Sequence, residues 1–324
     1  MRRREFITLV GGAAAWWPTV AHAQADRVRR IGVLTSLDPN DTEGQAEVRS
    51  LKQGLEELGW TEGRNLQVEY RWPGSEPARI QASVTELVGL RCEVIVARST
   101  PVMAALVRET RTIPIVFSYV ADPIGSGFIQ SFARPGGNVT GFQTYEFTLV
   151  GKWLDLLSMV SPSVRRVAYI YNPATAPGGF VRMLEAFVPS IPVQLLAAPV
   201  HKASEIDNAL VGLTREPGAG LLVVPDISND TNHEQISALA AQHSLPAIYA
   251  HRFDDALISY GPDLPDLFRR AASYVDRILR GEKPSELPVQ APTKYELIIN
   301  TKVAKALGLS VPAALLVAAD QVID

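Results

Sequence analysis

The chain has 324 residues, with 31 lysine and arginine residues against 34 aspartate and glutamate residues, so its formal net charge at pH 7 is −3. This mildly acidic, mixed balance argues against a nucleic-acid-binding protein, which needs a basic face. The only cysteine, Cys92, cannot form an internal disulfide, and we expect a small buried residue there rather than a reactive thiol.

The first 25 residues have the pattern of a secretory signal peptide. Arg3 and Arg4 precede an uncharged stretch, residues 7–20, which leads into the small-x-small cleavage signal at residues 21–23 (AHA). The paired arginines indicate the twin-arginine export route. A membrane anchor is the alternative, but spanning a bilayer takes about 20 apolar residues. We therefore predict cleavage near Ala23 and a mature protein that is free in the periplasm.

The next part of the chain alternates short apolar runs with amphipathic helices, which is typical of a parallel sheet covered on both faces. Strands are expected at residues 31–34, 66–70, 94–97 and 113–117. The pattern then restarts, with strands at residues 167–171, 193–196, 221–224 and 247–249, and a final strand at 297–299. The fold class is therefore α/β.

Both sets of strands end alike, since residues 112–117 (TIPIVF) and 244–249 (SLPAIY) each place a proline before a buried strand. This repeat favours two similar doubly wound parallel-sheet lobes over one eight-stranded sheet. A chain of this length can form two cores of ordinary domain size.

We expect an N-terminal lobe of residues 26–140 plus 260–283 and a C-terminal lobe of residues 141–250 plus 293–324. The chain would cross between them near residues 138–144, 250–260 and 284–293. Residues 133–141 are rich in turn formers, as a crossing should be. Three crossings make a hinge on which two lobes can close around a ligand.

Ligands of open parallel sheets bind beyond the carboxyl ends of the strands. Hydroxyl, carboxyl, amide and imidazole side chains stand at those positions, namely Ser36, Ser99, Thr100, Ser118 and Asp122 in the first lobe and Asn172, Asp226 and His251 in the second. Hydroxyls and helix N-termini offer donors to an anion, and aspartates offer acceptors to an ammonium group. This set suits a small polar ligand such as a zwitterion.

Each of these residues also has a purely structural explanation. Ser99 and Thr100 precede Pro101 and could cap a helix, and Asp122 could fix a turn. Asp226 could cap the element after its strand. The Asn172-Pro173 pair is a common turn dipeptide, and His251 could be a hinge or surface residue.

Catalytic and metal-binding signatures are missing from the sequence. There is no G-x-S-x-G, H-E-x-x-H or Walker-type glycine loop, and the five histidines show no metal-ligand spacing. We therefore predict no catalytic residue, no metal and no cofactor.

Several stretches, in the same order along the chain, resemble a known family: 30–34 (RIGVL), 54–65 (GLEELGWTEGRN), 112–117 (TIPIVF), 121–123 (ADP), 133–142 (ARPGGNVTGF), 259–263 (SYGPD) and 287–294 (LPVQAPTK). On these motifs the chain resembles the ABC transporter substrate-binding proteins related to the tryptophan-binding type, within the type I periplasmic binding fold. The resemblance implies a monomeric receptor that closes on a small organic solute and delivers it to a membrane permease.

The family's ligand contacts lie on loops that match Ser36, Ser99, Thr100, Asp122, Asn172 and Asp226. The segment between Ala250 and Ile258 is shorter than is usual in the family. This departure leaves open the role of His251 and the form of the ligand pocket's wall on the hinge side.

The leading interpretation is a periplasmic solute-binding component of an ABC importer, not an enzyme, with an amino-acid-like or aromatic ligand. One alternative is an exported two-lobed enzyme acting in the interlobe cleft, which would need an activated nucleophile or a matched acid and base. The other is a periplasmic sensor that binds the same solute but docks on a signalling receptor.

Overall fold

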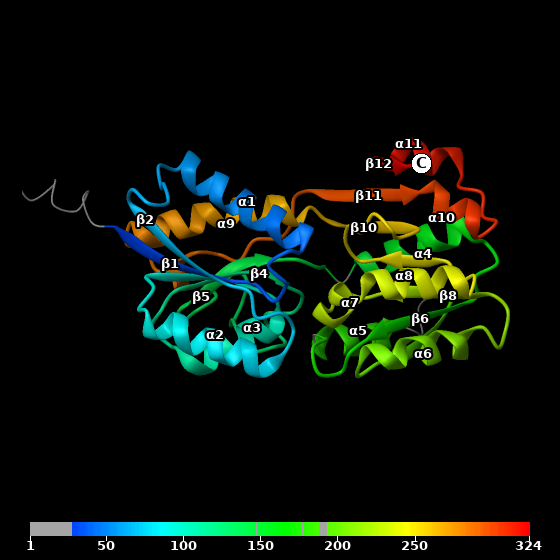
Figure 1. Ribbon diagram of the computed structural model, residues 1–324, viewed down its shortest axis with the longest axis horizontal. Coiled ribbons are helices and arrows are strands. Elements are labelled where there is room, and N and C mark those ends of the chain that lie inside the picture. The colour runs from blue at the N-terminus through cyan, green and yellow to red at the C-terminus, as the bar shows by residue number, and fades with distance from the viewer. Residues whose placement is uncertain (1–27, 147, 177, 188–192) are drawn as a thin grey trace, which may run out of the picture.

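The computed structural model describes residues 28–146, 148–176, 178–187 and 193–324, and Figure 1 shows them as two α/β lobes side by side. Each lobe has its own sheet, one of five strands and one of seven, so the prediction of two lobes rather than one continuous sheet is confirmed. The predicted signal peptide and its cleavage near Ala23 lie outside the described residues. Within those ranges no helix is both long and apolar enough to span a bilayer.

The N-terminal sheet has the order β2-β1-β3-β4-β5, with all neighbours parallel. Its strands are β1 (Arg29–Leu34), β2 (Leu66–Arg71), β3 (Val94–Arg98), β4 (Ile115–Val120) and β5 (Val139–Gln143). The first four follow the predicted apolar runs. Successive side chains of β3 belong to two different hydrophobic clusters, as expected for a strand buried on both faces.

Strand β5 was not predicted, because its sequence resembles a turn-rich interlobe crossing. Gly136 and Gly137, both with positive φ, form the turn, and the strand starts directly after it. Gly141 lets β5 approach β4 closely, since a Cβ there would lie 2.2 Å from the carbonyl oxygen of Phe117. The glycines therefore permit strand pairing here as well as a turn.

In the N-terminal lobe, α1 (Thr42–Glu57) and α9 (Leu264–Leu279) cover one face of the sheet, and α2 (Pro77–Gly89) and α3 (Thr100–Glu109) cover the other (Figure 1). Helix α9 begins as predicted, with the Asp263 side chain accepting a hydrogen bond from the Asp266 N–H. It buries an apolar face that includes Phe268 and Val275, and each such side chain stabilises the fold by about 1.5–3 kcal/mol.

The C-terminal sheet has the order β12-β11-β10-β9-β8-β6-β7, in which only the β10–β11 pair is antiparallel. The strands are β6 (Arg166–Tyr171), β7 (Gln194–Pro199), β8 (Ala219–Val223), β9 (Ala247–Tyr249), β10 (Ile258–Pro262), β11 (Tyr295–Asn300) and β12 (Gln321–Ile323). The helical elements around them are α4 (Leu149–Val160), α5 (Gly178–Phe187), η2 (Ala203–Glu205), α6 (Ile206–Leu213), α7 (Ile227–Thr231), α8 (His233–Gln242), α10 (Thr301–Ala306) and α11 (Ala313–Ala318). The short helix η3 (Pro284–Glu286) follows α9 and contacts β5 of the N-terminal lobe.

The chain passes between the lobes after β5, after β10 and before β11 (Figure 1). We expected the second crossing near residues 250–260, but β10 pairs with both β9 and β11 and so belongs to the C-terminal sheet up to Pro262. The first crossing likewise follows Gln143 rather than residue 140, because β5 pairs with β4.

Hydrogen bonds join the three crossings to one another. The Gln143 N–H donates to the Gln290 carbonyl at 2.9 Å, and the Gln290 N–H donates to the Gly141 carbonyl at 3.1 Å. The second and third crossings are joined by the Asp263 N–H, which donates to the Lys294 carbonyl at 3.1 Å, and by an ion pair between the same two side chains. The three crossings therefore form one hydrogen-bonded strip.

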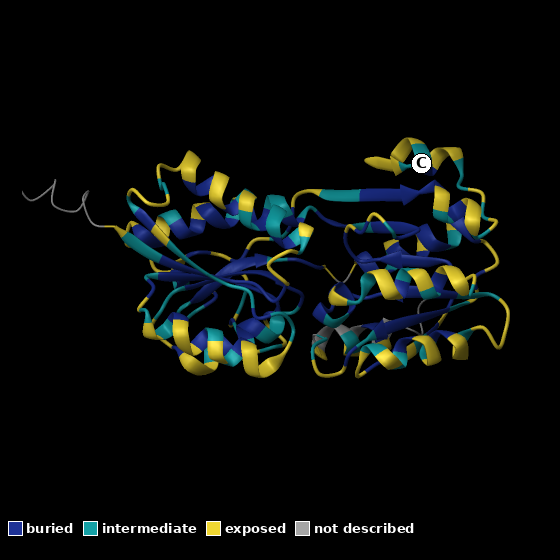
Figure 2. Ribbon diagram, viewed as in Figure 1, coloured by how far each residue is buried: buried dark blue, intermediate teal, exposed yellow. Residues whose placement is uncertain are grey.

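The inner strands of both sheets are buried, whereas the edge strand β12 and the outer faces of the helices are exposed (Figure 2). Cys92 is 3% exposed, and burial raises the pKa of its thiol to about 11. The prediction of a small buried residue is confirmed, because the thiol is protonated and inaccessible at neutral pH.

Candidate functional site in the interlobe cleft

Three serine hydroxyls are buried where neighbouring strands β1, β3 and β4 end. Ser36, Ser99 and Ser118 are each at most 2% exposed, and their Oγ atoms have no hydrogen-bond partner. Leaving a buried hydroxyl unpaired costs about 1–3 kcal/mol, and native proteins rarely do so. Of the predicted site residues, these three are therefore the ones whose geometry best suits contact with a ligand.

Ser99 is not the side-chain cap that its position before a helix suggested. It precedes α3, but its hydroxyl accepts no capping hydrogen bond and its φ is +87°. Tyr119, on β4, also has a positive φ, +57°. Such strain in non-glycine residues concentrates at functional sites. Both residues, with Thr100, line a small cleft, with room for no more than about one water molecule, that Asp226 and Thr175 of the C-terminal lobe also line.

Asp122 has the turn-fixing role that was its alternative explanation. Its Oδ1 accepts a hydrogen bond from the Gly125 N–H at 2.7 Å, and the side chain is half-buried. A Cβ on Gly125 would lie 2.0 Å from the other carboxylate oxygen, so a larger residue there would displace the Asp122 side chain.

Asp226 and Asn172 hold each other in place at the edge of the C-terminal sheet. Asp226 accepts hydrogen bonds from the Asn172 N–H at 2.6 Å, the Thr175 hydroxyl at 2.5 Å and the Ser228 N–H at 3.1 Å. The last of these caps α7. Burial raises the pKa of Asp226 to about 6. The carboxylate is thus occupied by its own lobe, in agreement with the capping explanation.

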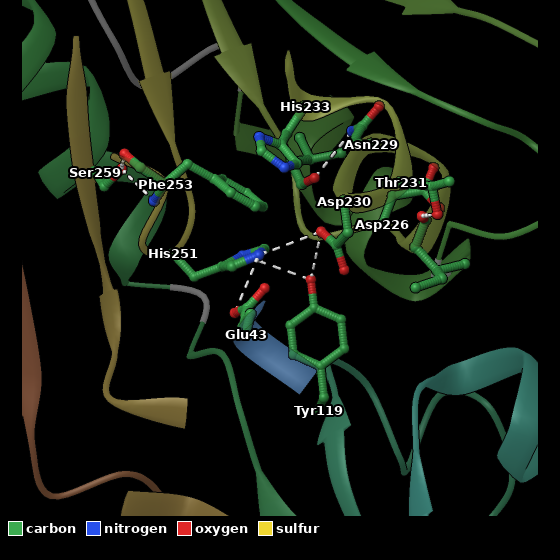
Figure 3. Close-up of polar contacts among 12 residues, drawn as sticks. Glu43, Tyr119, Asp226, Asn229, Asp230, Thr231, His233, His251, Phe253 and Ser259 are labelled. Atoms are coloured by element: carbon green, nitrogen blue, oxygen red, sulfur yellow. Dashed lines mark hydrogen bonds and ion pairs between the residues drawn. The ribbon is translucent and has the colours of Figure 1, made fainter. Parts of the chain in front are cut away.

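His251 is neither a hinge residue nor a surface residue, since it is 2% exposed in the middle of the interlobe contact (Figure 3). Its Nδ1 lies 3.0 Å from the Tyr145 hydroxyl and 3.5 Å from the Tyr119 hydroxyl. Its Nε2 lies 3.3 Å from Asp230 and 3.8 Å from Glu43. His251 therefore connects polar groups from both lobes.

Arg98, which the sequence analysis missed, is the cation of this contact. Its guanidinium is fully buried, and Nε donates to both carboxylate oxygens of Glu47, at 2.8 and 3.1 Å. It lies 4.1 Å from the ring centre of Tyr119. Its Nη1 is 3.6 Å from Asp230 of the other lobe, and Nη2 is 4.0 Å from Glu43. We call Glu43, Glu47, Arg98, Tyr119, Asp230 and His251 the interlobe cluster.

The interlobe cluster has more carboxylates than cations. Burial raises the pKa of Glu47 to about 7 and also raises that of Glu43 well above its usual range. For Asp230 burial acts in the same direction, but the charge and hydrogen bonding of His251 outweigh it and lower the pKa. The Tyr119 hydroxyl donates to Asp230 across the lobe boundary at 2.9 Å. These contacts favour the close approach of the two lobes.

A larger groove lies beside the interlobe cluster, has a volume of about 590 Å³ and is partly open to solvent. Both lobes line it, through the first turn of α1, the start of α9, the start of α8 and the segment after β9. We call it the acidic groove, since its lining includes Asp41, Glu43, Glu234, Asp254, Asp255, Asp263 and Glu296. No group of three or more His, Cys, Asp or Glu residues in the described ranges is arranged to hold a metal ion.

The comparisons with known proteins agree with this architecture. A family model described as ABC transporter substrate binding protein matches residues 32–323. A tyrosine-binding protein from Clostridioides difficile is 25% identical over 266 residues, which cover 79% of this chain and 75% of that protein.

Two solved structures share the fold over nearly their whole length. A conserved domain protein from Vibrio cholerae aligns with a TM-score of 0.84 and 27% identity, over 91% of this chain and 100% of that one. An ABC domain from Streptococcus pneumonia in complex with L-Trp aligns with a TM-score of 0.83 and 21% identity, over 91% and 99%. The predicted type I periplasmic binding fold is thus confirmed.

Proposed function

The chain belongs to the family of ABC transporter substrate-binding proteins, and we propose that its ligand is a small polar organic solute, amino-acid-like or aromatic. The solute binds between the two lobes and leaves unaltered, and the permease of an ABC importer receives it.

The observation that carries this proposal is where the unsatisfied polar atoms lie. Among the described residues, the buried hydroxyl oxygens of Ser36, Ser99 and Ser118 have no hydrogen-bond partner, and all three lie at the strand ends of the N-terminal lobe. A polar solute that entered between the lobes would satisfy some of these atoms and so favour the closed form. Such a difference in affinity between open and closed forms is what drives closure of a receptor.

The relatives support the ligand class. The relative from Clostridioides difficile is a tyrosine-binding protein, and the pneumococcal domain was solved with L-Trp. We infer ligand contact for five of the predicted residues, Ser36, Ser99, Thr100, Ser118 and His251. The remaining three, Asp122, Asn172 and Asp226, shape the loops around the site.

The pattern of the first 25 residues supports an exported protein. In this proposal the twin-arginine route delivers the chain, cleavage occurs near Ala23, and the mature protein acts in the periplasm as a monomer that docks on the permease.

A thermal-shift screen over amino acids, nucleosides and aromatic acids tests the proposal. Ligand at a hundred times its dissociation constant should add about 2.7 kcal/mol to the free energy of unfolding. Chromatography of each hit after incubation should return the solute unchanged. Turnover of a hit would overturn the receptor assignment, and so would the failure of every solute to stabilise the protein.

A further inference from the structure

The acidic groove carries more negative charge than its surroundings compensate. Arg252, His233 and Lys294 each form an ion pair with a carboxylate of its lining. These three cations do not pair with Glu43 or Glu234, and Glu43 instead lies 3.8 Å from His251 and 4.0 Å from Arg98. A groove with one sign of charge and protein walls focuses the field and raises the local concentration of cations.

The interlobe cluster behind the groove has the same imbalance. Arg98 is its guanidinium, and the carboxylates of Glu47, Asp230 and Glu43 surround it at 2.8, 3.6 and 4.0 Å. Glu43 belongs to both sites, because it lines the groove and also reaches His251 (Figure 3). The groove and the cluster are therefore continuous.

Two buried atoms at this junction lack hydrogen-bond partners. The Oδ2 of Asp230, a residue 3% exposed, accepts no hydrogen bond and lies 3.6 Å from Arg98 Nη1, and the Nε2 of His251, a residue 2% exposed, makes none and lies 3.3 Å from Asp230 Oδ1. Figure 3 shows the His251 ring between Asp230 and Glu43. An ammonium group offers three donors, which suit the carboxylate oxygens of Asp230 and Glu43. A carboxylate placed there would face the Asp230 charge in a poorly solvated site, whereas an ammonium group would favour the charged form of Glu43, whose pKa burial raises.

The groove also has an apolar wall. Ala46, Pro262, Leu264 and Pro265 line it together with Phe253, whose ring stacks on His233 with centroids 4.2 Å apart. Such a wall suits the hydrocarbon or aromatic body of a solute.

We propose that the acidic groove is part of the ligand site and that it selects an organic cation, with an ammonium group and an apolar body, over a zwitterion or a carboxylate. This inference rests on the proposed function, because it names the ligand class of the same interlobe site.

Three probes that share one ring test the charge preference by titration calorimetry on the mature protein: tyramine, tyrosine and 3-(4-hydroxyphenyl)propionate. Tyramine is the cation, tyrosine the zwitterion and the propionate the anion. We expect tyramine to bind at least about tenfold more tightly than the other two, because the propionate lacks the ammonium donor and tyrosine adds a carboxylate that the acidic lining would repel.

Equal or tighter binding of tyrosine or the propionate would overturn the charge assignment and leave solute binding intact. Binding of none of the three would also overturn it, and the wider solute screen would then decide the proposed function separately.

A matched pair of variants on α1 tests the location. Glu43→Gln should weaken tyramine binding about tenfold, whereas Glu56→Gln, at the exposed far end of the same helix, should leave it unchanged. Glu234→Gln, on the opposite wall, should weaken it less, because that carboxylate acts through the field of the groove. Equal affinities of the Glu43 and Glu56 variants, with both folded by circular dichroism, would place the site elsewhere.

Discussion

The two facing lobe edges contain similar polar side chains but use them differently. On the N-terminal edge the hydroxyls of Ser36, Ser99 and Ser118 are buried without partners. On the C-terminal edge Asp226 accepts three hydrogen bonds, and Asn229 donates to two backbone carbonyls at 2.8 and 3.0 Å. Burial at a strand end therefore does not identify a ligand contact. Unsatisfied hydrogen-bonding capacity does, and by this criterion the three serines are better candidates for ligand contact than Asp226 and Asn229.

Arg98, on the N-terminal edge, is paired with Glu47 through its Nε, and its replacement should lower the free energy of unfolding most. Arg98→Met leaves Glu47 buried without its cation, which should lower the free energy of unfolding by about 4 kcal/mol. Urea denaturation measures this loss. Combining it with Glu47→Leu removes both charges and should recover most of the stability. A loss below about 1 kcal/mol in the single variant would contradict the assigned pairing.

On the C-terminal edge, Asp226→Ala should cost about 3 kcal/mol, because it leaves the N–H groups of Asn172 and Ser228 without their acceptor. Asp122→Ala removes a single turn hydrogen bond at a half-buried site and should cost about 1 kcal/mol. Both losses can be read from urea midpoints. A larger loss for Asp122 than for Asp226 would reverse our ranking of the two carboxylates.

Glu47 on the N-terminal edge and Asp226 on the C-terminal edge should make the stability of the protein depend on pH over different ranges. Burial raises the pKa of Glu47 to about 7 and that of Asp226 to about 6, from ordinary values of 4.5 and 3.8. The folded protein then holds protons that the unfolded chain releases, so stability falls as pH rises through these windows, by at most about 1.4 kcal/mol per pH unit for each group. Asp230, whose pKa is lowered, acts in the opposite direction.

Unfolding free energies at pH 4, 5, 6 and 7 would test these signs. Glu47→Gln should flatten the decline up to about pH 7, and Asp226→Asn only the part below about pH 6. A steeper decline in either variant would show that its carboxylate is stabilised in its charged form.

The smallest change in stability is expected at Ser99. Ser99→Ala removes a hydroxyl without a partner, so the free energy of unfolding should change by less than about 0.5 kcal/mol. Ser99→Gly should raise the free energy of unfolding by about 1 kcal/mol, because glycine adopts a positive φ without strain. Both variants should bind the solute found in the screen about tenfold more weakly. Unchanged affinity would remove Ser99 from the site.

The sequence predicted those parts of the fold that depend on local pattern. The apolar runs of β1 to β4 and the Asp263 cap of α9 are each contained in a few neighbouring residues. Strands β5 and β10 were missed because their glycines and prolines also suit loops. Only the pairing with β4 in one case, and with β9 and β11 in the other, makes them strands.

The site was only partly predictable, for a related reason. Strand ends are visible in the sequence, so the three serines could be named. The interlobe cluster brings together residues as distant as Glu47 and Asp230, whose proximity depends on how the lobes pack. One signal was present: Arg98 ends an otherwise apolar strand, and a buried charge needs a partner.

The strip of hydrogen bonds across the crossings limits how the lobes can move. Hydrogen bonds join Gln143 to Gln290 and Asp263 to Lys294, so one crossing cannot rotate about its own backbone unless its neighbours rotate with it. Twisting or sliding one lobe past the other would break these bonds, whereas bending across the strip keeps them. The motion that this connection favours is therefore rotation of one lobe about a single hinge axis. Such a rotation separates Arg98 from Asp230 on opening and brings the two side chains back to the same relative position on closing.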